Sequence, residues 1–388
     1  MKILYISSAN IWGGGSVALY NMAYYMKCQG HEVCVFTSAR KGRLIDELNN
    51  NSIKCHVSRW DYPLTVWPKT NNPLTFINRC IRLFLIYFFV RRELLEVIKQ
   101  FQPNIVHTNV GPLDIALRLC RKSSIPHVWH MREYQDKDFD MHFIPLQMFF
   151  RRKIRSKGNF NLAITKDIFN YWNLRPGIDR IIYDGVFSNQ LLPKQIVKEK
   201  ENYILFVGRI EPAKAPYVLI RAYKEFINRL GNNSIKLKLA GTFNEDSPYY
   251  IKCANYVHEN NISENVDFLG ERNDVYSLMS KAICLVVPSE SEGFGFITVE
   301  GMVNHCPVLG RMTGGTREQL INGLEYEGAP IAIPFNNEVE LVEALQNVTT
   351  KDTGEMVKRA YDMVISHYTI EKSGEEVEKF YNDILQSK

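Results

Sequence analysis

Short runs of strand-forming residues alternate with longer amphipathic segments along most of the chain. Before residue 190 the strand-like runs are KILYIS, EVCVFTS, NIVHTN, PHVWHM and FNLAIT; after residue 200 they are YILFVGR, IKLKLAG, NVDFLG, ICLVVPS, CPVLGR and APIAIPF. Helical patterns separate most of these runs. Apolar strands that alternate with helices are typical of parallel sheets covered on both faces. The pattern therefore predicts an α/β chain with doubly wound sheets.

The length of the chain predicts two such domains. Its 388 residues exceed the roughly 250 to 300 at which a single core stops growing. The polar segment 187–202 contains Pro193 and precedes a new strand, so we expect it to be a linker between domains 1–186 and 203–365. Two parallel sheets that face one another would bind ligands in a cleft beyond the carboxyl ends of their strands.

Charge is distributed unevenly along the sequence. Residues 1–190 hold 26 Lys and Arg against 14 Asp and Glu, a net charge of +12, whereas residues 191–388 hold 21 against 28, a net charge of −7. The basic first half indicates either an anionic partner or a solvated surface of mixed charge. Segments 76–99 and 141–157 combine aromatic and basic residues, which suits an anionic lipid surface. Core packing with basic helix ends is the alternative interpretation.

Cysteines and apolar runs indicate where the chain resides. The eight cysteines show no CxxC pairing, so neither a metal cluster nor a disulfide framework is expected, and a reducing cytoplasm fits best. The N-terminus resembles a first strand rather than a signal peptide. The longest apolar run, residues 83–90, is bracketed by arginines and is shorter than the ~20 residues that a spanning helix needs.

Glycines follow the first strand in the stretch NIWGGGS. Gly13, Gly14 and Gly15 would let the backbone approach a ligand closely, and the start of the following helix would present amides to an anion. A tight strand-to-helix connection is the alternative interpretation. The next strand ends in VCVFTSAR, without the acidic residue that holds the ribose of NAD.

Two cations follow the first strand of the second half, in VGRIEPAKAPY. Arg209 and Lys214 lie in one loop beyond a strand end, where they could match the charge of a diphosphate. An ordinary solvated position for both is the alternative.

Two carboxylates flank the turn in SEGFGFITVE. Glu292 lies at the mouth of the loop and Glu300 about one turn into the next predicted helix, so both could reach one small ligand. Carboxylates accept hydrogen bonds from the paired hydroxyls of a sugar. Two acids also suggest the acid and base of a glycosidase, and charge near a helix start is the alternative without a ligand.

This stretch resembles the E-x7-E signature of the retaining glycosyltransferases of family 4, whose GT-B fold has two facing Rossmann-like domains. The resemblance extends over nearly the whole chain, through GG at 13–14, VGRIEPAK at 207–214, NVDFLG at 265–270 and PVLGRMTGGTREQL at 307–320. A C-terminal helix at 366–388 is expected to pack back toward the N-terminal domain.

The resemblance implies a role for each of the four charged residues described above in the second half. Glu300 would bind the ribose hydroxyls of the donor nucleotide. Glu292 would bind hydroxyls of the donor sugar and belongs, with His130, to the catalytic residues. Arg209 and Lys214 would neutralise the diphosphate.

Other donor contacts implied by the resemblance come from backbone. The loop with Gly13 and Gly14 would assist the phosphates. The amides that would do the same belong to Phe294, Gly295, Phe296 and Ile297. His130 matches a histidine that the family places close to the reacting sugar, although the residues alone suggest an ordinary strand-end histidine. Ala215 and Asp184 depart from the residues common in the family, without removing a charged contact.

The resemblance implies transfer of a hexose, with retention, from a nucleoside-diphosphate sugar to a saccharide or lipid-linked acceptor in bacterial polysaccharide or glycoconjugate synthesis. No metal is expected, and we interpret Asp136 and Asp138 as an exposed loop rather than a metal site. The expected location is the cytoplasm, with peripheral binding to the inner face of the membrane. The alternatives are a sugar-nucleotide epimerase of the same fold and a non-catalytic sugar-nucleotide-binding protein. No nucleic-acid-binding module is recognised.

Overall fold

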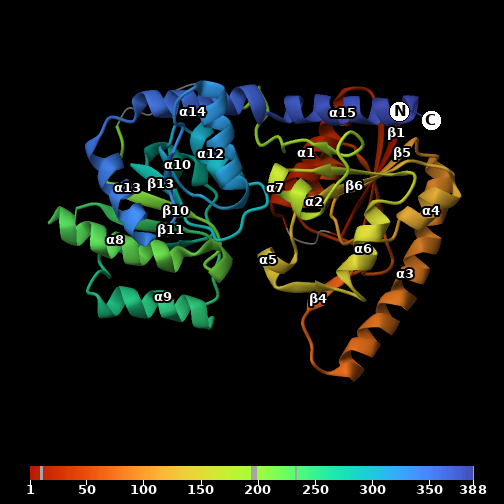
Figure 1. Cartoon of the computed structure of the whole chain (residues 1–388), viewed down its shortest axis with the longest axis horizontal. Helices are drawn as coiled ribbons and strands as arrows, with labels where there is room; N and C mark the ends of the chain where they lie inside the picture. Colours follow the sequence, from red (N-terminus) through yellow and green to blue (C-terminus); the bar gives the residue numbers. More distant parts are fainter. Residues whose placement is uncertain (9–11, 194–198, 232–233, 388) are drawn as a thin grey trace. The chain divides into compact units, whose positions relative to one another are not determined.

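The computed structural model describes residues 1–8, 12–193, 199–231 and 234–387. They form two units, the first comprising Met1–Gly185 with Ile370–Lys388 and the second Val186–Thr369. Each unit holds one parallel sheet between helices (Figure 1). The predicted α/β class, with two Rossmann-like domains, is confirmed.

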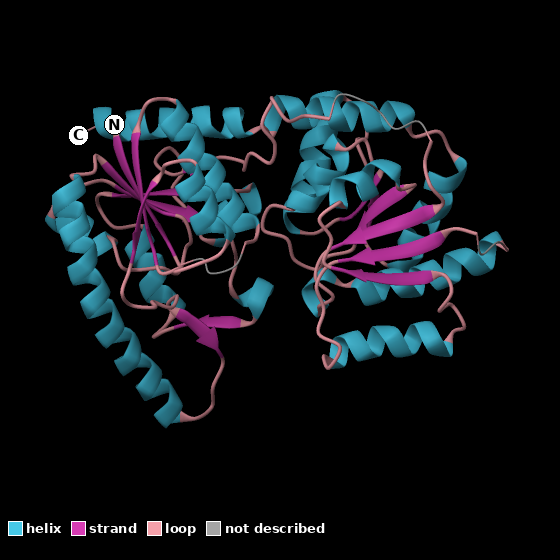
Figure 2. Ribbon diagram, turned by 180° about the vertical axis from the view of Figure 1, so that it is seen from behind, coloured by secondary structure: helices cyan, strands magenta, loops and turns pink. Residues whose placement is uncertain are grey.

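Seven parallel strands form the central sheet of the first unit, in the order β3-β2-β1-β5-β6-β8-β9. Figure 2 shows in magenta the strands of each unit, with helices in cyan beside them. The bounds of the seven strands are β1 Lys2–Ser7, β2 Glu32–Thr37, β3 Lys54–Val57, β5 Ile105–Thr108, β6 His127–Met131, β8 Asn159–Ala163 and β9 Arg180–Ile181. The central strands β5 and β6 are buried along their whole length, because helices cover both faces.

Alternate residues of β1 pack into two different cores. Ile3 and Tyr5 contact helices on one face, whereas Leu4 and Ile6 contact helices on the other. The first face is covered by α1 Gly14–Cys28, α2 Arg43–Asn50 and α15 Ile370–Gln386, and the second by α3 Pro73–Phe101 and α4 Leu117–Lys122. Smaller elements complete the unit: α5 Asp136–Phe139, α6 Gln147–Ile154, α7 Lys166–Tyr171, and the antiparallel strands β4 Val66–Pro68 and β7 Met141–Phe143.

The C-terminal helix α15 packs against α1 at a glycine. A Cβ atom at Gly374 would lie 2.3 Å from Cδ1 of Tyr25, so only glycine allows this separation of the two helices. Phe380 and Tyr381 of α15 are buried in the core that also contains β1. The last helix is therefore an integral part of the first unit.

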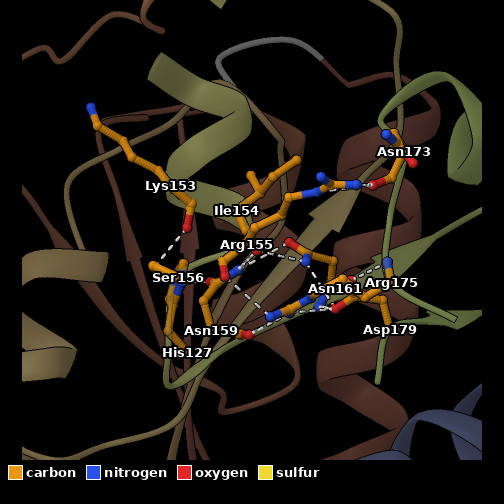
Figure 3. Close-up of polar contacts among 10 residues, drawn as sticks. All are labelled: His127, Lys153, Ile154, Arg155, Ser156, Asn159, Asn161, Asn173, Arg175 and Asp179. Atoms are coloured by element: carbon orange, nitrogen blue, oxygen red, sulfur yellow. Dashed lines mark hydrogen bonds and ion pairs between the residues drawn. The ribbon is translucent and has the colours of Figure 1, made fainter. Parts of the chain in front are cut away.

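A buried polar cluster fixes the end of α6 to β8 (Figure 3). Arg175 donates to both carboxylate oxygens of Asp179 at 3.0 and 2.8 Å, and Asn161 Nδ2 donates to the same carboxylate at 2.9 Å. Asn159 Nδ2 donates to the carbonyl oxygen of Ile154, at the end of α6, at 2.7 Å. Because buried polar groups without partners are costly, this satisfied cluster specifies one position for α6.

Six parallel strands form the sheet of the second unit, in the order β12-β11-β10-β13-β14-β15. Their bounds are β10 Tyr203–Val207, β11 Lys236–Ala240, β12 Val266–Gly270, β13 Cys284–Val287, β14 Val308–Arg311 and β15 Ile333–Phe335. One face is covered by α8 Pro216–Leu230, α9 Pro248–Glu259 and α13 Glu338–Thr350. The remaining helices of this unit are α10 Val275–Lys281, α11 Phe296–Val303, α12 Gly314–Glu327 and α14 Gly354–His367.

Helix α3 is far longer than the apolar run that the sequence suggested. It has 29 residues, starting at Pro73 after an Asn72 cap that accepts from two backbone amides, and ending at Gln102 in the left-handed conformation. By length and composition alone it could cross a membrane, although its longest unbroken apolar run is the one expected at residues 83–90. Its buried side, which includes Val90 and Leu94, belongs to the core of the first unit.

Candidate active site

The strand order of the second sheet reverses between β10 and β13. Strands β11 and β12 lie on one side of this pair, and β14 and β15 lie on the other. The loops that follow β10 and β13 therefore diverge at the carboxyl edge of the sheet. Ligands of open parallel sheets bind at such a reversal point.

The two loops at this reversal point contact one another through a hydrogen bond and an ion pair. The amide of Glu290 donates to the carbonyl of Ala213 at 2.9 Å. Lys214 Nζ forms an ion pair with Glu292 Oε1 at 2.6 Å, and these side chains are 26% and 13% exposed. Lys214 and Glu292, predicted from separate motifs, thus lie together where a bound anion could reach them.

Arg209 lies in the same loop as Lys214 but is more exposed. Its guanidinium pairs with Glu211 at 2.9 Å, and 57% of its side chain is accessible. The backbone around Arg209 is tightly packed, because a Cβ at Gly241 would lie 2.0 Å from the carbonyl oxygen of Gly208. This glycine, in the left-handed region at φ +152°, lets the loops after β10 and β11 lie against each other.

Helix α11 begins directly after the loop that holds Glu292. Gly295 occupies the cap position in the left-handed conformation, and Phe296 and Ile297 form the first turn. Amides of a first helical turn have no partner within the helix and carry partial positive charge. The structure thus provides the helix start that was predicted to face phosphate oxygens.

Gly315, in the TGGT stretch, packs its backbone against the loop that holds Glu292. The amide of Gly315 donates to the carbonyl of Glu292 at 2.8 Å, and a Cβ at Gly315 would lie 2.2 Å from the carbonyl oxygen of Phe294. Gln319 Nε2 also donates to Phe294 O, at 2.6 Å. These contacts fix the backbone of residues 292–295 and explain why glycine is needed at 315.

Glu300 lies on α11, one turn after its start, and is partly buried. Burial raises the pKa of this carboxyl group to about 7, while a hydrogen bond with Tyr276 acts in the opposite direction. Both protonation states are therefore populated near neutral pH. A ligand hydroxyl that donates to the carboxylate would favour the ionised state.

The first sheet reverses its strand order between β1 and β5, and the predicted glycine turn follows β1. Asn109, just after β5, donates from Nδ2 to the carbonyl of Gly15 at 2.8 Å. Arg132, just after β6, donates from Nε to Asn109 Oδ1 at 3.0 Å. Gly13 is the N-cap of α1, with extended backbone, and a Cβ there would meet no atom within 4 Å. Gly14 is the first residue of α1.

His130 is buried at the end of β6, and its ring is oriented by Arg132. Nδ1 lies 3.2 Å from Arg132 Nη2 and 3.2 Å from His107 Nε2. Because a guanidinium can only donate, Nδ1 is an acceptor and the neutral ring carries its hydrogen on Nε2. Burial, then the charge of Arg132, holds the pKa of His130 well below its usual range. Nε2 is buried and has no hydrogen-bond partner among the residues that the structure describes.

Further buried contacts hold this histidine in place. His107 Nε2 donates to His130, so its Nδ1 accepts from the hydroxyl of Tyr381, on α15, at 2.6 Å. Arg132 also forms a buried ion pair with Asp184 at 2.5 Å. Asp184 is thus the partner of the guanidinium that orients His130, rather than an incidental departure from the family pattern.

Sequence reasoning missed these supporting residues. Arg132 had a local signal, since it lies two positions after His130 and alternate strand residues point to one side. His107 lies on the adjacent strand β5, and apart from its position in a predicted strand the sequence carries no signal for it. Tyr381 is separated from His107 by 274 positions, so no motif could connect them.

Asp136 and Asp138 form the short helix α5, not the exposed loop that we expected. Asp136 Oδ1 accepts from the hydroxyl of Tyr171 at 2.7 Å, and Asp138 Oδ2 accepts from the amide of Tyr134 at 2.8 Å. Within the described parts of the chain, no group of three or more His, Cys, Asp or Glu side chains has the arrangement of a metal site.

Both halves of the chain match models of known protein families. A family model described as Glycosyltransferase Family 4 matches residues 12–186, and one described as Glycosyl transferases group 1 matches residues 188–363. An uncharacterized glycosyltransferase of Methanocaldococcus jannaschii is 34% identical over 175 residues, 45% of each chain. The O-antigen chain mannosyltransferase RfbU of Salmonella typhimurium is 27% identical over 184 residues, 47% of this chain and 49% of that protein. The chain thus spans about half the length of the curated relatives it matches.

Solved structures resemble the chain over its whole length. Anabaena HepE in complex with UDP superimposes with a TM-score of 0.77 and 17% identity, covering 99% of this chain and 100% of that chain. A glycosyltransferase from Rickettsia africae gives a TM-score of 0.77 and 17% identity, with coverages of 100% and 99%. The fold is therefore that of the GT-B glycosyltransferases. With both halves matched by family models, the chain belongs to glycosyltransferase family 4, as its motifs predicted.

Proposed function

We propose that the chain transfers a hexose from a nucleoside-diphosphate sugar to a saccharide or lipid-linked acceptor, with retention of anomeric configuration. The observation that carries the proposal is the Lys214–Glu292 pair at the strand reversal of the second sheet, between a cationic loop and a helix start. Structures of HepE with UDP and with UDP-glucose support a nucleotide-sugar donor. The name of RfbU, an O-antigen chain mannosyltransferase, supports a role in bacterial polysaccharide or glycoconjugate synthesis.

Residues of the second unit would hold the donor. Arg209, Lys214 and the first amides of α11 bind the diphosphate, because they supply positive charge at one loop cluster. Glu300 accepts from the ribose hydroxyls, and Glu292 accepts from hydroxyls of the sugar. When the diphosphate binds Lys214, the ion pair with Glu292 opens and releases this carboxylate for the sugar.

The transfer step needs no nucleophile from the protein. The bond between the anomeric carbon and the diphosphate oxygen breaks, and the acceptor oxygen bonds to the same face of that carbon. The acceptor proton passes to an oxygen of the leaving diphosphate, so all atoms are accounted for. Lys214, Arg209 and the oriented amides stabilise the charge that grows on the leaving group, which is transition-state stabilisation without a metal.

The first unit would contribute a hydrogen bond to the reacting sugar. His130 carries its hydrogen on a buried Nε2 that has no partner among the described residues, so it can donate to a sugar hydroxyl. The loop with Gly13 and Gly14 would approach the phosphates through its backbone. The eight cysteines are free thiols, which agrees with action in the cytoplasm. Peripheral binding to the inner face of the membrane completes the proposal.

A panel of nucleotide sugars tests the proposal. Thermal unfolding is measured with uridine, guanosine and adenosine diphosphates and their sugars, since a ligand at a hundred times its Kd adds about 2.7 kcal/mol to stability. Turnover of the stabilising donor, with and without EDTA, then tests for transfer and for metal. If no nucleotide in the panel stabilised the chain, the proposal would be overturned. Isomerised donor without an acceptor would indicate the epimerase instead.

A further inference from the structure

One side of helix α3 exposes a continuous apolar stripe, which we call the outer face of α3. Its members are Leu74, Ile77, Ile81, Phe84, Leu85 and Phe88, and each is between 50% and 72% exposed. Steps of three and four residues place them on one side of a helix. The opposite side, including Leu83, Tyr87 and Val90, is buried. Helix α3, the long orange helix of Figure 1, is therefore apolar on two sides, and among the described residues only one of these sides belongs to the core of its own unit.

An apolar stripe of this size is unusual on a water-exposed surface. Scattered apolar residues are normal, but contiguous patches of large side chains mark interaction sites. Trp60 lies beside the stripe, stacked on Phe89 with ring centroids 4.8 Å apart, and both rings are partly exposed. Aromatic side chains of this kind are enriched where protein meets the headgroup region of a bilayer.

The helix that carries the outer face is also basic, although Arg91 is paired with Asp114 and Arg79 donates to the carbonyl of Pro68. Helix α3 contains Arg79, Arg82, Arg91, Arg92 and Lys99 against two glutamates, Glu93 and Glu96. The guanidinium of Arg92 lies 6.0 Å from the ring centroid of Phe88, so charge and apolar surface are adjacent. Lys and Arg side chains near an anionic membrane surface are attracted to it, and salt screens this attraction. An apolar stripe beside basic side chains suits a partner that has an anionic surface layer and an apolar interior.

We propose that the outer face of α3 lies in the headgroup region of an anionic phospholipid bilayer, with the helix parallel to the membrane surface. This inference rests on the peripheral membrane binding in the proposed function and names its surface and the lipid charge, but it does not depend on the chemistry proposed for the active site. Spanning is excluded, because the opposite side of α3 packs on Leu4 and Phe36 of the parallel sheet. A symmetric contact between two copies would place Arg82 and Arg92 of both chains in one interface, and this gathering of like charge opposes dimerisation through this face.

Vesicle sedimentation tests the proposal directly. The wild-type chain should sediment with vesicles of phosphatidylcholine and phosphatidylglycerol, less so at high salt, and not with phosphatidylcholine alone. Replacing Ile81, Phe84 and Phe88 by Glu should lower the bound fraction at least tenfold. These side chains are at least half exposed, so the fold should persist, which circular dichroism and thermal unfolding in the presence of UDP would verify.

Two further variants separate the contributions. Arg82→Gln with Arg92→Gln should weaken binding and reduce its salt dependence, because it removes charge but leaves the apolar stripe. Val339→Glu is the matched control, since Val339 is an exposed apolar residue on α13 of the second unit. It should bind vesicles like the wild type.

Three results would overturn the inference. The first is a wild-type chain that is stabilised by UDP but does not sediment with anionic vesicles, which leaves the proposed transfer intact. The second is unchanged binding by the triple Glu variant. The third is a lipid-free dimer, measured by sedimentation velocity, that dissociates in that variant, because a second copy would then be the partner of the outer face.

Discussion

Lys214 and Glu292 form an ion pair, with Nζ 2.6 Å from Oε1, between the two loops at the strand reversal of the second sheet. The pair joins residues 78 positions apart, one from the cationic loop and one from the E-x7-E stretch. Each group has a different proposed ligand, the diphosphate for the lysine and the sugar for the glutamate. Under the proposed function, the pair holds both groups at the site until a donor replaces their mutual contact.

Lys214→Met should impair transfer without unfolding the chain. The side chain is partly exposed, so its loss leaves no large cavity. Removal of one preorganised cation from a developing anion costs roughly 100-fold in rate, and we expect kcat/KM for the donor to fall by about that amount. Steady-state kinetics check the expectation. Lys358→Met, at an exposed position on α14, serves as control and should retain full activity.

Glu292→Gln should separate nucleotide binding from sugar transfer. The amide removes the charge that holds Lys214, so the lysine is more available to a diphosphate. An ion pair of partly exposed groups is worth at most about 1 kcal/mol, so the Kd for UDP should fall by up to about fivefold while transfer is lost. Calorimetric titration with UDP measures the change. Weaker UDP binding in this variant would contradict the proposed competition.

Donor binding should tighten with pH because of Glu300. Its folded-state pKa of about 7 lies above the ordinary 4.5, so this group destabilises the folded chain progressively as pH rises through that interval. Ribose hydroxyls that donate to the carboxylate favour its ionised form, so binding releases a proton. From pH 6 to pH 8 the ionised fraction rises about tenfold, and the affinity for a nucleotide sugar should follow.

The control for this pH effect is Glu300→Gln. A nucleotide sugar has no phosphate group that titrates in this range, so it is a better ligand than UDP. The Gln variant should bind it more weakly at pH 8 and with no comparable dependence on pH. An equal pH dependence in both proteins would assign the effect to another group.

The buried central strands could be predicted from sequence, whereas the two edge strands of the first sheet, β3 and β9, could not. Residues of β10 lie between two layers of helices, so they read as the unbroken apolar run YILFV. Strand β3, with the sequence KCHV, lies at the edge of its sheet and is only partly buried, so it carries no such pattern. Complete burial therefore explains the clear signal of β10, and partial burial at the sheet edge explains the missing signal of β3.

The residues of the candidate site also fall into two groups, those whose proximity the sequence could predict and those whose proximity it could not. Glu292 and Glu300 belong to one loop and the helix that follows it, so their proximity follows from local geometry. The orientation of His130 depends on Arg132, Asp184 and Tyr381, which come from three separate parts of the chain. Contacts formed only by tertiary packing leave no periodic signal in one sequence.

Gly13→Ala tests whether the glycine turn contacts a ligand. The backbone of Gly13 is extended, and an added Cβ would have open space, so the protein itself does not require glycine there. Thermal stability should therefore be unchanged. A phosphate that approaches this backbone would meet the new methyl group, and KM for the donor should rise several-fold. If both stability and KM stay unchanged, the turn is a strand-to-helix connection without a ligand.

Tyr381→Phe should slow transfer although the residue acts only through His107. Loss of the hydroxyl leaves His107 Nδ1 without its donor at 2.6 Å, so the proton can move to Nδ1 and the bond to His130 is lost. One net hydrogen bond is worth about 1 kcal/mol, which predicts a similar loss of stability and a several-fold drop in kcat. The Kd for UDP should not change, because the residues proposed to bind the nucleotide belong to the second unit.

Tyr5→Phe is the matched control for Tyr381→Phe. The Tyr5 hydroxyl lies 3.4 Å from that of Tyr381 and is one step further from the histidines, so its loss should lower stability but preserve kcat. Equal losses of kcat in the two variants would indicate a general packing effect instead of a relay to His130. A selective loss in Tyr381→Phe would show that the last helix of the chain holds the His130 ring in its donating tautomer, which links the C-terminus to the chemistry of the first unit.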